Sequence, residues 1–141
     1  MDDNFSEDTK YWVALSTHQK IGARTFNKLY KRFKKLKNVW QADKSEIFGA
    51  GLDLGQVDAV KEVTEKVDPD SLIVELNKLQ LKVLILPDKD YPQLLKEIPD
   101  PPGVIYLRGQ IKPEDELALA VVGSRKYTPY GRDVTERLVW Q

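Results

Sequence analysis

The chain has 141 residues, with 22 basic and 22 acidic side chains, so its formal net charge at pH 7 is zero. Hydrophobic residues make up 41% and charged residues 31%, an ordinary globular composition. No apolar run reaches the roughly 18 residues of a membrane span, and the acidic start Met1-Asp2-Asp3 does not fit a signal peptide. The lack of cysteine excludes disulfides and thiolate metal sites, and His18 is the sole imidazole. We therefore expect a cytoplasmic protein without membrane contact, metal or cofactor.

Residues 8–68 carry the apolar spacing of several short helices. Asp43 and Glu46 form a capping pair before one of them, and Asp68-Pro69 begins the next. Glycine turns at Gly22 and Gly49 suggest a repeated helix-hairpin-helix unit. The residues expected on buried helix faces are Tyr11, Trp12 and Leu15, then Phe26, Leu29, Tyr30, Phe33 and Leu36 or Trp40, then Val57, Val60, Val63 and Val67, and finally Leu72, Ile73, Leu76 and Leu79.

After residue 80 the apolar pattern changes to short runs that predict strands. These runs are residues 82–86, 104–107 and 117–122, with a short helix expected within 91–98 and another after Thr128. Helices followed by alternating strands and helices indicate the α/β class. We place the domain boundary between residues 68 and 69, giving a helical domain 1–68 and an α/β domain 69–141.

The loop from Gly123 to Tyr127 is predicted to join the end of a buried strand to the start of a helix. Free backbone N–H groups and the helix dipole favour an anion at such a point. Ser124 can donate a hydrogen bond, and Arg125 can contact two phosphate oxygens at once. The dinucleotide fingerprint and the Walker pattern are absent. We therefore favour an open phosphate contact, with a plain polar turn as the alternative.

Positive charge is concentrated in residues 20–37, which hold eight cations and no acid. Local rather than net charge governs attraction to a polyanion. Lys31, Lys34 and Lys35 are expected on one side of a helix. A contact with a polyanion and a solvated helix face are both open for them. We expect His18 at a helix end. We also expect turn roles for the acids around the strands, which are Asp88, Asp90, Glu114, Asp115 and Glu116. Tyr130 is expected to pack inward.

Three stretches together resemble a known family. DYPQLLKEIPDPPGVIYLRG (90–109) resembles the tyrosine-proline, Asp-Pro-Pro and Arg-Gly signature of the DNA processing protein A family, also called DprA or Smf. AVVGSRKYTPYG (120–131) is similar to the first strand-to-helix turn of that family's Rossmann-like domain. IGARTFNKLYKRF (21–33) is similar to its amino-terminal helix-hairpin-helix. The resemblance covers nearly the whole chain.

This resemblance implies a helical SAM-like (helix-hairpin-helix) domain over 1–68 and the first part of an extended Rossmann-like domain over 69–141. It implies binding of single-stranded DNA in a basic pocket, loading of RecA during natural transformation and recombination, and no catalysis. The DNA-binding residues that we expect are Gly123, Ser124, Arg125, Lys126 and Thr128, with Lys31, Lys34 and Lys35 as a secondary contact.

The chain departs from the family pattern at Gln80, where the family usually has glycine. It also ends one helix after the Gly123 loop, so we expect a truncated Rossmann-like domain that lacks the family's RecA and homodimer surfaces. A cut chain and a truncated gene product both fit this ending. We expect the helical domain to fold alone and the strands after it to be incompletely covered.

Two other functions were weighed. Nucleotide-cleaving phosphoribohydrolases are Rossmann-like and have a similar glycine-serine turn, but their Pro-Gly-Gly-rich loop and later glutamate do not appear here. The chain could also be a helical interaction module with an unstructured tail.

Overall fold

The structure is a computed structural model that describes residues 6–140, apart from the side chain of Glu116. The acidic start Met1 to Asp3, the side chain of Glu116 and the terminal Gln141 therefore lie outside the described residues. The chain forms two compact units, the first running to Gln110 and the second starting at Ile111. It is a helix-rich mixed fold with one two-stranded sheet, which is compatible with the α/β class.

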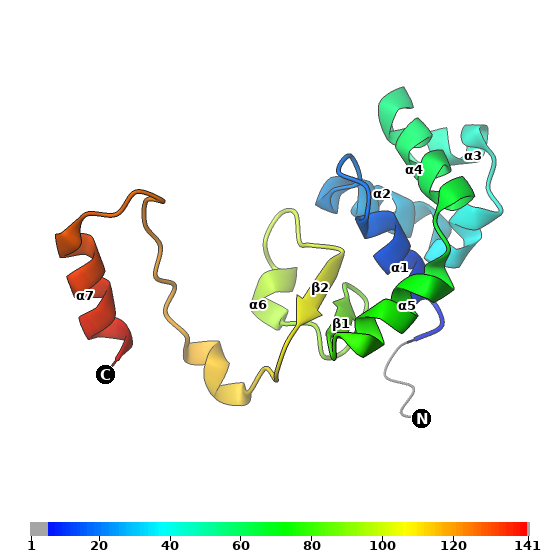
Figure 1. Ribbon diagram of the computed structural model, residues 1–141. Helices are drawn as coiled ribbons and strands as arrows, with labels where there is room; N and C mark the ends of the chain where they lie inside the picture. Colours follow the sequence, from blue (N-terminus) through cyan, green and yellow to red (C-terminus); the bar gives the residue numbers. More distant parts are fainter. Residues whose placement is uncertain (1–5, 141) are drawn as a thin grey trace. The chain divides into compact units, whose positions relative to one another are not determined.

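The first unit consists of a group of short helices followed by a strand pair (Figure 1). Its elements are α1 (Thr9–Ser16), α2 (Ala23–Phe33), the 3-10 helix η1 (Leu36–Trp40), α3 (Lys44–Phe48), α4 (Leu54–Lys66), α5 (Pro69–Lys78), β1 (Lys82–Ile85), α6 (Gln93–Lys96) and β2 (Val104–Leu107). The predicted helices before residue 69 and the first two predicted strands are thereby confirmed.

Local capping explains where several helices begin. The Asp43 side chain accepts from the Glu46 N–H at 2.8 Å and the Glu46 carboxylate accepts from the Asp43 N–H at 2.9 Å, so the predicted capping pair is confirmed. Asp68 caps α5 ahead of Pro69, also as predicted. A third pair, Asp53 and Gln56, caps α4 in the same way. These helices start where short polar side chains satisfy otherwise unpaired N–H groups.

The core of this unit is built around Trp12, which is fully buried. Its ring stacks on Phe26 with centroids 5.3 Å apart, and its indole N–H donates to Asp8 Oδ2 at 2.9 Å. Asp8 also accepts from the N–H groups of Leu36 and Lys37, which fixes η1 beside the start of α1. Most of the predicted buried positions are buried or packed against the core. Leu79 is an exception, because it is the C-cap of α5 and is 56% exposed.

The two strands of the first unit pair antiparallel, with Lys82 opposite Leu107 and Ile85 opposite Val104. Val83, Leu84 and Ile85 are buried, and Val83 and Ile85 belong to the same apolar cluster as the helices. The expectation that the first strands would be poorly covered is therefore wrong for β1. The helices cover it, and the compact unit continues to Gln110.

Residues of the Asp-Pro-Pro-Gly signature fasten the strands to the helices. Arg24 of α2 pairs with Asp100 at 2.9 Å, and the buried Tyr91 hydroxyl donates to the Pro102 carbonyl at 2.8 Å. Burial raises the pKa of Tyr91, so this phenol remains a donor at neutral pH. Gly103 lies directly on Phe26, and an added Cβ would come within 2.5 Å of the ring. This part of the signature is thus used for packing.

The second unit contains the 3-10 helix η2 (Pro113–Leu117) and the helix α7 (Pro129–Val139). The predicted strand over 117–122 is wrong, because these residues form no ladder with any described residue. Leu117, Leu119 and Val122 are more than 80% exposed. An apolar run becomes a strand only where another strand satisfies its backbone groups. The inward packing expected for Tyr130 is also wrong, since it is 79% exposed.

Gln80 ends α5 in a conformation that suits glycine. Its N–H donates to the Asn77 carbonyl and the Leu81 N–H donates to the Leu76 carbonyl, which together form a Schellman motif. Gln80 occupies the position of that motif that takes a left-handed backbone, with φ of 53°. A side chain strains this conformation, whereas glycine adopts it freely.

We expect Gln80→Gly to raise the free energy of unfolding by about 0.5–1 kcal/mol, because relief of left-handed strain exceeds the added entropy of the unfolded chain. Urea denaturation measures this. Leu79→Gly, one residue earlier at a right-handed position, serves as the control and should lower stability. If both variants lose the same amount of stability, the inference that the Gln80 backbone is strained is wrong.

Gly103→Ala should lower the free energy of unfolding by about 1–3 kcal/mol, because the new methyl group overlaps the buried Phe26 ring. Thermal and urea unfolding of the chain measure this loss. Repeating the substitution in a Phe26→Leu background provides the control, since a smaller side chain leaves room for the methyl group. The same loss in both backgrounds would show that the contact is not responsible.

Candidate nucleic-acid interface

The five predicted DNA-binding residues lie together in the loop that leads into α7. Thr128 caps this helix as predicted, accepting from the Gly131 N–H at 3.1 Å. Ser124 accepts from the Lys126 N–H at 3.2 Å, which closes a small turn and leaves its hydroxyl hydrogen free to donate outward. All five residues are exposed. The structure presents them on an open loop rather than in a cavity.

The backbone at this helix start offers little to an anion. Pro129 has no N–H, and the Thr128 hydroxyl occupies the N–H of Gly131. The Arg132 N–H donates to the Thr128 carbonyl within the helix. Among the described residues of the first turn, this leaves the Tyr130 N–H as the backbone donor that could meet an anion. An anion here would therefore be held mainly by side chains, in contrast to the backbone contact expected from the sequence.

The side chains of the loop provide positive charge without nearby acids. From residue 117 to residue 132 the chain has Arg125, Lys126 and Arg132, and no carboxylate. Arg132 pairs with Glu136 at 3.7 Å in α7. Arg125 and Lys126 form no ion pair with any described residue. Two exposed cations beside a hydroxyl donor are groups that can contact a phosphate from an open surface.

Gly123 is not required by the conformation of this loop. A Cβ there would meet nothing within 4 Å, and its φ lies outside the left-handed range. Its value would lie in close approach of a ligand to the backbone, which a side chain would hinder.

The basic trio in the first unit has a different geometry from the one predicted. Lys31 is in the last turn of α2, but the helix ends at Phe33 and Lys34 turns into the left-handed region with φ of 61°. Lys35 then follows in an extended conformation. The three side chains are exposed and form no ion pair with described residues, yet they do not share one helix face. The choice between a DNA contact and a solvated surface is thus still a prediction.

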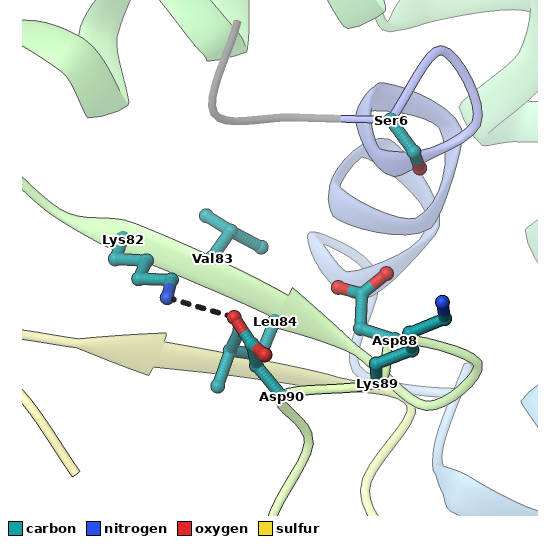
Figure 2. A pocket seen from close by; sticks show the side chains of 7 residues that line it. All are labelled: Ser6, Lys82, Val83, Leu84, Asp88, Lys89 and Asp90. Atoms are coloured by element: carbon teal, nitrogen blue, oxygen red, sulfur yellow. Dashed lines mark hydrogen bonds and ion pairs between the residues drawn. The ribbon is translucent and has the colours of Figure 1, made fainter. Parts of the chain in front are cut away.

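A small pocket of about 230 Å³ lies beside β1, and Figure 2 shows it. Lys82 and Asp90 pair within it at 3.3 Å, and the Asp88 carboxylate accepts from the Ile85 N–H. Asp88 and Asp90 thus have structural partners, in line with the turn roles expected for them. None of the predicted DNA-binding residues lines this pocket.

A larger groove, of about 880 Å³, lies between α2 and the turn that joins α3 to α4. Arg24 and Lys28 line it from α2, and the half-exposed Phe48 lines it from the end of α3. The sequence indicates no role for Phe48, and it places Arg24 and Lys28 only within the basic run of residues 20–37. The available signal in the sequence was an aromatic residue, Phe48, at the end of a helix and followed closely by Gly49 and Gly51.

His18 lies just after α1, as expected, with Nε2 3.6 Å from the Glu62 carboxylate. A hydrogen bond from Lys66 holds the pKa of Glu62 below its usual value.

Within residues 6–140, no group of three potential metal ligands is assembled. The helices of this same part of the chain are too short or too polar to span a bilayer.

Comparison with known proteins connects the loop and the strand pair to a family. Residues 82–141, which include β1, β2 and the whole loop before α7, match the family model for DNA recombination-mediator protein A. This part of the chain is thus similar to that family. It is similar to Protein Smf from Synechocystis sp., with 26% identity over 140 residues, which cover 94% of this chain and 35% of that protein. It is also 46% identical over 63 residues to Protein Smf from Borreliella burgdorferi, covering 41% of this chain and 20% of that protein.

The chain thus spans about a third of the first relative and a fifth of the second. No solved structure matches it at a significant level. The resemblance to this family noted in the sequence is confirmed, with the family model matching residues 82–141.

The basic trio allows a direct test. Replacing Lys31, Lys34 and Lys35 together by Gln removes three charges without introducing a helix breaker. If these side chains are only solvated and do not contact DNA, the substitution leaves the affinity for a single-stranded oligonucleotide unchanged, as measured by fluorescence anisotropy. If each contacts a phosphate, the slope of log affinity against log salt falls by about 2 to 3. An unchanged circular dichroism spectrum controls for folding.

Proposed function

We propose that this chain binds single-stranded DNA and that the loop of residues 123–128 contacts its phosphates. The observation that carries the proposal is the position of two exposed cations, Arg125 and Lys126, in an acid-free loop within the part of the chain that matches a recombination-mediator family. Neither cation forms an ion pair with a residue that the structure describes. Phosphate contacts supply most of the affinity in non-specific binding of nucleic acid.

The open shape of the loop supports a strand rather than a small nucleotide. A nucleotide-binding loop wraps the phosphates with several backbone N–H groups, and here Pro129 and the Thr128 hydroxyl remove most of them. Exposed side chains can instead follow a polyanion of variable path. The proposed role is therefore binding, and the protein is proposed not to be an enzyme.

The wider role follows from the family resemblance. The helices up to residue 68 would form the SAM-like domain, and residues 69–141 the beginning of the Rossmann-like domain. The proposed action is to load RecA onto single-stranded DNA in the cytoplasm during recombination and natural transformation. RecA and a second copy of the protein are proposed as partners.

Arg125→Ala is expected to weaken binding of an oligothymidylate several-fold and to lower the salt slope by about 1, because one phosphate contact is lost. Arg125→Lys should recover only part of the affinity, since an ammonium lacks the planar fork of the guanidinium. Filter binding at two or more salt concentrations measures both quantities.

Arg137→Ala, in the last turn of α7, is the matched control because it removes the same charge outside the loop. It should leave the slope nearly unchanged. Equal effects of the two alanine variants would assign the attraction to overall charge and remove Arg125 from the interface. Turnover of a nucleoside monophosphate without DNA binding would instead favour the phosphoribohydrolase alternative.

A further inference from the structure

The groove between α2 and the α3–α4 turn has walls that are fixed to each other. Lys28 of α2 donates from Nζ to the Gly51 carbonyl of the turn at 2.6 Å. Gln56 of α4 donates to the buried hydroxyl of Thr25 in α2 at 3.1 Å. These two contacts join the two walls of the groove and so fix its width. A preformed site binds more tightly because little ordering remains to be done.

The two sides of the groove differ in chemistry. The α2 side carries two cations, Arg24, whose side chain is 81% exposed, and Lys28. Arg24 uses its Nε–H for Asp100, and Lys28 uses one ammonium hydrogen for Gly51, so both retain free donors. The opposite side carries two apolar side chains that face solvent, Phe48 at 52% exposure and Leu54 at 72%.

One carboxylate also lines the groove and limits where an anion can lie. Asp53 caps α4 by accepting from the Gln56 N–H at 2.8 Å, so it stays in place beside Leu54 and Gly55. A phosphate would be repelled from that end and drawn toward Arg24 and Lys28. The groove therefore favours an occupant with negative charge along one edge and a flat apolar face along the other.

We propose that this groove is a second binding site for single-stranded nucleic acid, in which a base stacks on Phe48 while the adjoining phosphates contact Arg24 and Lys28. It deepens the proposed function by adding a contact in the first unit, and it does not depend on the loop at 123–128. Stacking on an exposed aromatic ring accepts any base, as expected of a protein that binds strands of many sequences.

An acidic amphipathic peptide is the competing occupant, and the geometry favours it less. A helix laid in a groove needs several apolar pockets at intervals of three or four residues. This groove offers Phe48 and Leu54 as exposed apolar side chains, with Asp53 close to the second. One ring beside two phosphate-binding cations suits a nucleotide unit better.

The test compares two strands of equal length and charge, an oligothymidylate and a matching abasic oligodeoxynucleotide, binding to the 141-residue chain. Phe48→Ala should weaken binding of the oligothymidylate about fivefold or more and leave the abasic strand unchanged, because only the first can stack. Lys28→Gln should weaken both strands to a similar extent. Fluorescence anisotropy at constant salt measures each affinity.

Leu94→Ala and Lys78→Gln are the controls, as an exposed apolar residue and an exposed lysine outside the groove. The proposal is overturned if Phe48→Ala affects both strands equally, affects neither, or lowers only the binding of an acidic amphipathic peptide. Repeating the comparison with Arg125→Ala separates the two sites. If Phe48→Ala still weakens binding of the oligothymidylate in the Arg125→Ala background, the groove is supported even when Arg125→Ala by itself has no effect. If Arg125→Ala weakens binding and Phe48→Ala does not, the groove is rejected and the loop is retained.

Discussion

The packing of Gly103 on the Phe26 ring is the contact on which the first unit depends. Phe26 in turn stacks on Trp12, which is fully buried at the centre of the helices. Because glycine has no side chain, the turn before β2 can approach the ring closely, and Leu86 donates its N–H to the Gly103 carbonyl. The strand pair is thereby held against α1 and α2. The signature that marks the family in the sequence thus has a packing role in the structure.

The helices of this unit could be predicted because their determinants are local. Asp43 with Glu46, and Asp68 before Pro69, mark helix starts within four residues of sequence. The pairing of β1 with β2 could not be predicted in the same way. Its register depends on Tyr91 and Gly103, which meet partners 11 and more residues away, and such contacts leave no periodic pattern in the sequence.

The run from Leu117 to Val122 shows what an apolar pattern does not determine. The residues are those of a buried strand, but a strand also needs a neighbour for its N–H and C=O groups, and no described residue provides one. The loop residues after it were singled out by the expected strand-to-helix turn and by the family resemblance, and their role in DNA binding is still a prediction. Their geometry was not, because it depends on how Thr128 and Pro129 use the first N–H groups of α7.

The loop and the groove would both contact phosphates, and the groove would add stacking of a base on Phe48. Contacts of Arg125 and Lys126 with phosphate are electrostatic, and salt weakens them by competing for the backbone. Stacking of a base on Phe48 is not screened by ions and also buries apolar surface. At low salt the phosphate contacts of both sites would therefore dominate affinity, whereas the part of the affinity that survives at high salt would depend on Phe48.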